Sequence, residues 1–160
     1  MIRTFMMVAT TVASLAFSPT GIGQSADHGT AAEAKAMLMK AVAAVKADKT
    51  KALEMFNAGT GGFRDRDLYV FFCANMGDGK IVATGNPNGK QVLGQDQRTL
   101  KDSTGKNYGQ ELYAAGQKPE GQISEVSYLF PRPGTDAKPA PKVSMVTRAG
   151  DLLCGVGYYK

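Results

Sequence analysis

The stretch LYVFFCANMGDGKIVATGNPNG, residues 68–89, decides the fold because two apolar runs flank an Asp-Gly pair. Residues 68–75 are aromatic, β-branched and small, without polar alternation, which predicts a strand buried on both faces. Asp78-Gly79 predicts a two-residue hairpin turn, and residues 80–85 the returning strand. The segment carries Cys73 but no His, paired carboxylates or phosphate loop. The segment by itself is compatible with part of an active site and with one wall of a ligand cup.

The segment before this hairpin, residues 30–59, predicts one long helix or two abutting helices. Thr30 can cap the first turn, and Glu33 completes a capping box three residues later. Apolar residues recur at helical spacing from Leu38 to Phe56, and Gly59 ends the pattern. This stripe is typical of a helix packed on a sheet.

The segment after the hairpin predicts loops, one short helix and three strands. The helix is expected over residues 108–115, and the strands over 123–130, 142–148 and 152–159. The proline-rich stretch PRPGTDAKPAP, residues 131–141, is expected to lie outside strand interiors. The order of elements predicts an α+β fold: a five-stranded antiparallel sheet with the long helix on one face and the loops and short helix on the other.

The first 26 residues have the layout of a secretory signal peptide. Arg3 precedes an apolar run over residues 5–17, and Ser18-Pro19 and small residues follow. This run is shorter than the roughly 20 residues of a membrane-spanning helix, although an uncleaved anchor remains the alternative. We therefore expect residues 27–160 to form a single free-standing exported domain, periplasmic or secreted, without a stable membrane span.

The charge pattern argues against nucleic-acid binding. The formal net charge is +5, but the Lys and Arg residues are scattered along the chain and form no continuous basic stripe. A mild positive field suits an anionic small molecule, or serves solubility alone.

Enzyme and metal motifs are absent from the sequence. His28 is the only histidine and precedes the packed elements, so no catalytic triad or zinc site is expected. There is no GxSxG, HExxH or GxxxxGK[ST] motif, and the two cysteines, Cys73 and Cys154, form neither CxxC nor CxxCH. We expect no catalytic residues, no metal and no cofactor. A thiol-dependent enzyme is the remaining alternative.

Two further features are interpreted as structural. Gly155 and Gly157 fall inside the last predicted strand, with no helix after them, so we expect them to let another group approach the sheet closely. Asp65 and Asp67 flank Arg66 at strand spacing, which predicts a solvated turn at the entry to the first strand.

Polar and aromatic residues in the second half of the chain are the candidates for a ligand site. They are Tyr108, Tyr113, Tyr128, Phe130, Arg132 and Lys142. One lysine and two tyrosine hydroxyls can hold a carboxylate by charge-assisted hydrogen bonds at the polar end of an apolar pocket. In the alternative interpretation the tyrosines lie at the edge of the core and Lys142 is solvated.

Four stretches together resemble a known family: residues 67–96, KDSTGKNYGQELYAAG, YLFPRPGTDAKPAPKVSMV and the closing GDLLCGVGYYK. They resemble the single Cache domains, of the Cache_2 type, of bacterial extracytoplasmic sensors. The resemblance implies a PAS-like sheet with the long helix behind it and a ligand cup in front. It also implies a small-molecule ligand, commonly a short carboxylate, and a link to a membrane receptor or sensor kinase.

The same resemblance suggests individual residues. Tyr128 and Lys142 are expected to line the cup, with Tyr108 at the start of the short helix; Phe130 and Arg64 complete the proposed ligand-binding set. The PAS-like strand order makes the first and last strands neighbours, which brings together Cys73 and Cys154. A disulfide closing a loop of about 80 residues and a pair of buried thiols both remain open.

The expected function is that of an exported, sensor-type domain that binds a small organic acid and has no output domain of its own. The alternative is a periplasmic accessory protein that docks on a membrane receptor and binds no ligand.

Overall fold

The computed structural model describes residues 27–133 and 138–160. The predicted signal peptide lies outside the described residues. The helices and strands follow in the order α1 (Ala31–Ala47), α2 (Lys49–Ala58), β1 (Arg64–Asp65), β2 (Leu68–Asn75), β3 (Ile81–Ala83), α3 (Tyr108–Gly116), β4 (Ser124–Pro131), β5 (Pro139–Ala149) and β6 (Leu152–Tyr159). Two single-turn 3₁₀ helices lie between β3 and α3.

The N-terminal helical segment divides into two helices. The predicted capping box is present, because the Thr30 side chain accepts from the backbone N–H of Glu33 and the Glu33 carboxylate accepts from that of Thr30. Asp48 ends α1 in an extended conformation and caps α2 by accepting from the backbone N–H of Lys51. Gly59 ends α2 with φ of 68°, in the left-handed region that favours glycine.

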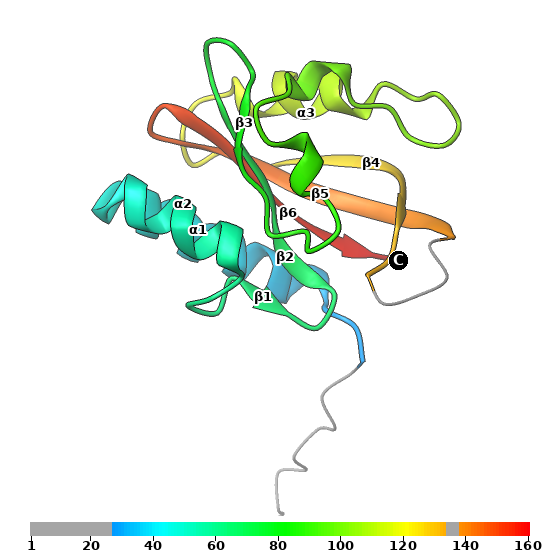
Figure 1. Ribbon diagram of the computed structural model, residues 1–160, viewed down its shortest axis with the longest axis horizontal. Helices are drawn as coiled ribbons and strands as arrows, with labels where there is room; N and C mark the ends of the chain where they lie inside the picture. Colours follow the sequence, from blue (N-terminus) through cyan, green and yellow to red (C-terminus); the bar gives the residue numbers. More distant parts are fainter. Residues whose placement is uncertain (1–26, 134–137) are drawn as a thin grey trace, which may run out of the picture.

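The sheet is antiparallel, with the order β1-β2-β6-β5-β4, and β3 pairs with β2 (Figure 1). All five predicted strands are present, and the two-residue β1 is a sixth that the sequence pattern did not indicate. The α+β prediction is confirmed, including the neighbouring positions of the first long strand, β2, and the last, β6.

The turn of the first hairpin is longer than predicted. The backbone N–H of Asn75 donates to the carbonyl of Lys80, so four residues, 76–79, form the loop. Asp78 accepts from the N–H of Lys80 through its side chain, and Gly79 has φ of 73°. Asp-Gly therefore closes a four-residue loop and not a two-residue turn.

The proline-rich connection also differs from the prediction, since prolines at both of its ends belong to strands. Pro131 ends β4, and β5 already contains Pro139 and Pro141. At the pair Leu129↔Pro141 the N–H of Leu129 points away from β5, to the carboxylate of Asp102. The backbone nitrogen of Pro141, which has no hydrogen to donate, therefore points toward β6. Because the pairing of β5 with β6 begins at the next residue, Lys142, this proline removes no hydrogen bond of the sheet.

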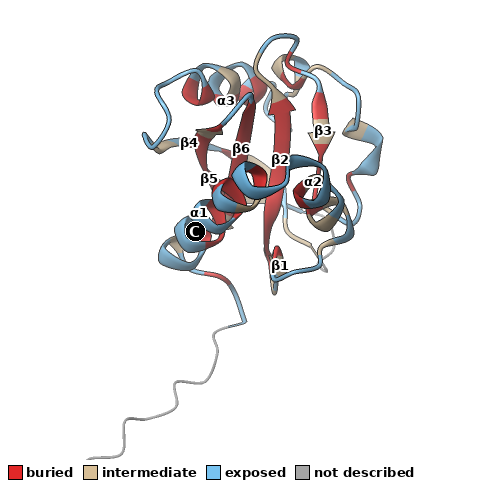
Figure 2. Ribbon diagram, turned by 90° about the vertical axis from the view of Figure 1, so that its left-hand side faces the viewer, coloured by how far each residue is buried: buried red, intermediate tan, exposed pale blue. Residues whose placement is uncertain are grey.

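Two groups of buried side chains lie on opposite faces of the sheet. Figure 2 shows that most residues of the central strands are buried. One face packs against α1 and α2, where Leu38, Val42 and Phe56 meet Val70 and Val156. The other face packs against α3 and the loops before it, and its side chains are largely aromatic. This second face holds the cavity described below.

A disulfide crosses the centre of the sheet between β2 and β6. Cys73 and Cys154 are directly paired in the strand register, with their Cα atoms 4.2 Å apart, and both are fully buried. The bond joins residues 81 positions apart in the sequence. It ties the first long strand to the last one.

None of the helices in the described ranges is both long and apolar enough to cross a bilayer.

Candidate functional site

A β-bulge in β2 concentrates aromatic rings on the face opposite α1 and α2. The pairing of β2 with β6 shifts register between Val70 and Phe72, so Phe71 is the extra residue. Strict alternation would send Phe71 and Phe72 to opposite faces, but both belong to the aromatic core of the cavity face. The Thr84 hydroxyl donates to the Phe71 carbonyl oxygen, 2.9 Å away, at this irregular point.

Lys142 lies buried among aromatic rings, with 1% of its surface exposed. Its ammonium Nζ donates to the Tyr69 hydroxyl over 2.9 Å. Four ring centroids surround Nζ, which we call the aromatic cage: Tyr69 at 4.4 Å, Phe71 at 4.6 Å, Phe130 at 4.8 Å and Tyr159 at 4.9 Å. Attraction to ring faces stabilises a cation that has left water. Lys142 is therefore not solvated, and the alternative interpretation of the sequence is wrong on this point.

The electrostatic environment of Lys142 leaves its charge poorly compensated. No carboxylate in the described part of the chain forms an ion pair with it, although Asp67 acts on it from a distance. Burial lowers the pKa of Lys142 from its ordinary value of 10.5 to about 7, and the negative charge of Asp67 opposes this. An anion entering the cage would meet a buried cation that has no carboxylate partner in the described residues.

Glycines in β6 make room for these side chains, as the sequence analysis expected. A Cβ atom at Gly157 would lie 2.4 Å from Cε of Lys142 and 2.8 Å from Oγ of Ser144, so the lysine side chain crosses β6 over this glycine. A Cβ atom at Gly155 would lie 2.7 Å from the Phe72 ring. The glycines are thus needed for close approach of side chains to the sheet and not for a turn.

Substitution of Gly157 by alanine is expected to expel the Lys142 side chain from its place over β6. Overpacking of this kind costs about 1–3 kcal/mol, and release of the buried charge offsets part of that cost, so the shift in unfolding temperature should be small. The displaced amine should also react faster with an acylating reagent, which peptide mass spectrometry measures. An alanine variant with wild-type stability and wild-type Lys142 reactivity would contradict the described position of the side chain.

Tyr128 and Tyr108 form a stacked pair beside the cage. Their ring centroids are 4.1 Å apart with an interplanar angle of 7°, and the Tyr128 hydroxyl shares a 2.7 Å hydrogen bond with Ser144. Burial raises the pKa of Tyr108 to about 12, and it raises that of Tyr128 well above its ordinary value. Both hydroxyls therefore stay protonated at neutral pH and can donate a hydrogen bond.

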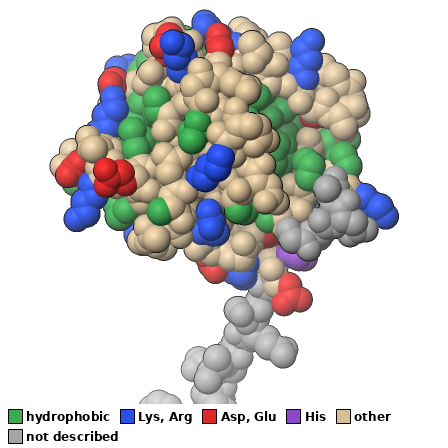
Figure 3. All heavy atoms as spheres, viewed as in Figure 1, with side chains coloured by type: hydrophobic (Ala, Val, Ile, Leu, Met, Phe, Trp, Pro, Cys, Tyr) green, Lys and Arg blue, Asp and Glu red, His purple; other side chains and the backbone are tan. Residues whose placement is uncertain are grey.

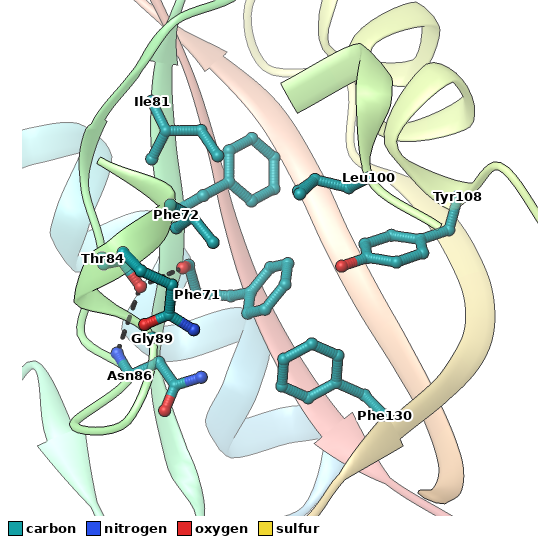
Figure 4. A pocket seen from close by; sticks show the side chains of 11 residues that line it. Phe71, Phe72, Ile81, Thr84, Asn86, Gly89, Leu100, Tyr108 and Phe130 are labelled. Atoms are coloured by element: carbon teal, nitrogen blue, oxygen red, sulfur yellow. Dashed lines mark hydrogen bonds between the residues drawn. The ribbon is translucent and has the colours of Figure 1, made fainter. Parts of the chain in front are cut away.

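A cavity of about 130 Å³ lies between the sheet and the loops before α3. Figure 4 shows side chains from β2 and the 84–89 segment facing Leu100, Tyr108 and Phe130 across it. The lining is mainly apolar, with polar groups at one side; it consists of Phe71, Phe72, Ile81, Thr84, Asn86, Gly89, Gln91, Val92, Leu100, Tyr108 and Phe130. Such a lining suits an apolar ligand or the apolar part of one.

Arg64, the remaining predicted ligand residue, does not line this cavity. Its guanidinium Nη2 donates to the carbonyl of Gly85, next to the lining residue Asn86. Lys90 reinforces the same rim by donating to the carbonyl oxygens of Asn57 (2.5 Å) and Thr84 (2.6 Å). Arg64 therefore supports the rim of the cavity from outside.

In the turn at residues 65–67, Asp65 is exposed as predicted, but Asp67 is buried, in contrast to the prediction. Asp67 is 5% exposed; its Oδ1 accepts from the backbone N–H of Gly29, and its Oδ2 lies 3.2 Å from Nδ1 of His28 and 3.6 Å from Nε of Arg132. His28 thus packs against the folded unit, in contrast to the prediction. Arg132 also stacks on the ring of Tyr159, 4.8 Å from its centroid, so this cluster touches the back of the cage.

Charges on one face of the molecule give no sign of a polyanion site there (Figure 3). On the face shown in Figure 3 the Lys and Arg side chains are dispersed among neutral and acidic ones. Within the described ranges, no group of three or more His, Cys, Asp or Glu side chains is placed to hold a metal ion.

The structure brings four of the five predicted ligand residues together. Lys142 and Phe130 belong to the cage, Tyr108 and Phe130 line the cavity, and Tyr128 joins the two through its stacked ring. The sequence analysis missed Tyr69, Phe71 and Tyr159 as cage residues. Tyr159 could have been found, since its register partner across β5–β6 is Lys142, but Phe71 depends on the bulge.

Comparison with known proteins places this geometry among sensor domains. The model of the family described as single Cache domain 2 matches residues 7–157. Two similar solved structures, each 25% identical and covering 80% of this chain, are a methyl-accepting chemotaxis protein from Vibrio parahaemolyticus (TM-score 0.60, 86% of that chain) and a periplasmic sensor domain of a chemotaxis protein (TM-score 0.58, 88%). A third, described as a Cache chemosensory domain that recognises carboxylic acids, shares the fold at 22% identity (TM-score 0.56, covering 80% of this chain and 86% of that one). A search of curated proteins gave no significant match.

Proposed function

The chain belongs to the single Cache domain 2 family, whose members are ligand-binding sensor domains and not enzymes, and we propose that it binds a small organic acid through Lys142. The observation that carries this proposal is the buried ammonium of Lys142, held by four rings and one tyrosine hydroxyl without a carboxylate partner in the described residues. A buried cation without a carboxylate partner destabilises a domain, so its presence favours a functional role. A carboxylate is the ligand group that compensates it directly.

The cavity beside the cage supports a small acid with an apolar tail. Its volume is about 130 Å³, and Phe72, Ile81, Val92 and Leu100 supply apolar surface. The Tyr69 hydroxyl accepts a hydrogen bond from the ammonium and so holds Nζ in place for a carboxylate. The structurally similar Cache domain described as recognising carboxylic acids supports the same ligand class.

We place this sensing role outside the cytoplasm. The Cys73–Cys154 disulfide is typical of an oxidising compartment, and one of the similar solved structures is described as periplasmic. Chemotaxis proteins among the similar structures favour a membrane receptor or sensor kinase as the partner that responds to the bound acid.

Thermal unfolding of residues 27–160 with a panel of short carboxylic acids tests the proposal. We expect at least one acid, at about 100 times its Kd, to raise the unfolding temperature by about 5 °C or more, since ligand binding to the folded state adds about 2.7 kcal/mol at that saturation. The primary amide of the same acid should give no shift, because it carries no charge to pair with Lys142. The variant Lys142→Met should lose the response to the acid.

Two outcomes would overturn this assignment. Equal shifts from acid and amide would show that the charge is not recognised, and an undiminished response of Lys142→Met would remove the lysine from the site. If a folded domain responds to none of the acids but binds a membrane receptor in a pull-down, the accessory-protein alternative replaces the proposal.

A further inference from the structure

Phe71 and Phe130 belong both to the aromatic cage and to the lining of the cavity. Their ring centroids lie 4.6 Å and 4.8 Å from Nζ of Lys142, and both rings face the cavity. Tyr69, Tyr159 and Lys142 do not line that cavity. The two phenylalanine rings, which we call the gate rings, therefore stand between the cavity and the ammonium.

The gate rings are in contact with each other and separate the cavity from the ammonium of Lys142. Their centroids are 5.2 Å apart at an interplanar angle of 83°, an edge-to-face arrangement that stabilises an aromatic pair. The closed arrangement keeps the cation against ring faces when no anion is present. A carboxylate held in the cavity would meet aromatic carbon and not the ammonium.

The two gate rings are held with different firmness. Phe71 is buried, sits at the bulge of β2, and its carbonyl oxygen accepts from the Thr84 hydroxyl. Phe130 is only partly buried and lies one residue before the end of the edge strand β4. The Phe130 ring therefore has the smaller barrier to rotating away from its place between the cavity and the ammonium. The Phe71 ring is expected to stay in place.

We propose that Phe71 and Phe130 form an aromatic gate, and that the carboxylate of an acid bound in this cavity reaches Lys142 when the Phe130 ring swings away from Phe71. This inference rests on the proposed function for the identity of the ligand group, but the gate itself is a property of the ligand-free domain. When the gate opens, Lys142 loses its contact with the Phe130 ring and gains an ion pair with the ligand carboxylate. The charge-assisted pair is the stronger of the two contacts. The gap that one ring can vacate is narrow, so the gate favours acids that are unbranched beside the carboxylate.

The first experiment needs no ligand. The domain is acylated with N-acetoxysuccinimide at pH 8, and modification of Lys142 is followed by peptide mass spectrometry. Phe130→Ala is expected to label Lys142 at least tenfold faster than the wild type. The matched control, Phe72→Ala, removes a ring that lines the same cavity but does not belong to the cage, and it should label Lys142 within twofold of the wild-type rate.

A second variant keeps the test valid if alanine unfolds the domain. Phe130→Leu retains most of the apolar volume and should give an intermediate labelling rate, with circular dichroism checking the fold of every variant. Equal labelling of Lys142 in the wild type and in folded Phe130 variants would overturn the gate. Fast labelling of Phe72→Ala, matching Phe130→Ala, would overturn it as well, because enlargement of the cavity would then suffice.

The acid-binding arm separates the gate from the ligand assignment. Wild-type domain should bind propionate more tightly than isobutyrate, and Phe130→Ala should reduce that preference at least fivefold. An unchanged preference in a variant that binds both acids would contradict the role of the gate in selection. If labelling responds as expected while neither acid nor any other carboxylate binds, the gate is supported and the proposed ligand class fails.

Discussion

Replacing Lys142 by methionine is expected to raise the free energy of unfolding by about 2–4 kcal/mol at pH 7. Burial lowers the pKa of this lysine from 10.5 to about 7, and each unit of such a shift corresponds to about 1.4 kcal/mol. Methionine has a similar length, needs no charge compensation and packs well among aromatic rings. The Tyr69 hydroxyl keeps Tyr159 as a hydrogen-bonding neighbour when the ammonium is gone.

The pH dependence of stability follows from the same shift. The unfolded chain holds the Lys142 proton up to about pH 10.5, whereas the folded domain releases it near pH 7. Between these values the unfolded state binds more protons, so the stability of the wild type rises with pH. Above about pH 10 the tyrosines reverse the trend, because folding raises the pKa of Tyr108 and Tyr159 to about 12. Burial also lowers the pKa of Lys90, but Lys90 is common to both proteins, so the difference between wild type and Lys142→Met over pH 7 to pH 9 isolates Lys142.

Urea unfolding of wild type and Lys142→Met at pH 7, 8 and 9 measures both effects. The stability advantage of the variant should shrink by about 2 kcal/mol over this range. The wild type becomes more stable as Lys142 loses its proton, whereas the variant has no charge at this position. Lys35→Met, at an exposed position of α1, is the matched control and should change stability by less than about 0.5 kcal/mol at each pH. A Lys142→Met variant that is less stable than the wild type at pH 7 would show that the cage compensates the charge fully.

Loss of the Cys73–Cys154 disulfide is expected to lower the free energy of unfolding by about 4 kcal/mol. The bond joins residues 81 positions apart, and closing a loop of that length removes much of the entropy of the unfolded chain. This is a large part of the 5–15 kcal/mol that is typical of a domain's whole stability. Both cysteines are fully buried between β2 and β6, so the native sheet shields the bond from reductant until the domain opens.

The double variant Cys73→Ala/Cys154→Ala, unfolded in urea beside the wild type, measures the contribution. A reducing agent should destabilise the wild type by a similar amount and leave the double variant unchanged, which is the internal control. A loss below about 1 kcal/mol, or a double variant that responds to reductant, would contradict the loop-closure account.

Much of the scaffold could be predicted from short segments of the sequence. The capping box at Thr30 and Glu33, the end of the helical segment at Gly59 and the strand character of residues 68–75 depend on neighbours within a few positions. Periods of 3.6 and 2 residues are likewise local, and they fix which segments form helices and strands.

Prediction failed where a residue's surroundings come from distant segments. Asp67 looked solvated beside Arg66, but it is buried because Gly29 and Arg132 fold against it. A pattern within one segment of the sequence cannot predict contacts with residues from distant segments.

The sequence by itself therefore determined the elements of this domain, the family to which it belongs and the presence of a lysine with tyrosines in its second half. Only the tertiary structure decided that Lys142 is buried over Gly157, and that the bulge turns Phe71 toward the cavity. The physical reason is that backbone preference and periodicity act within a segment. The burial of a charge and the register of a bulge are set between strands that lie more than 60 residues apart in the chain.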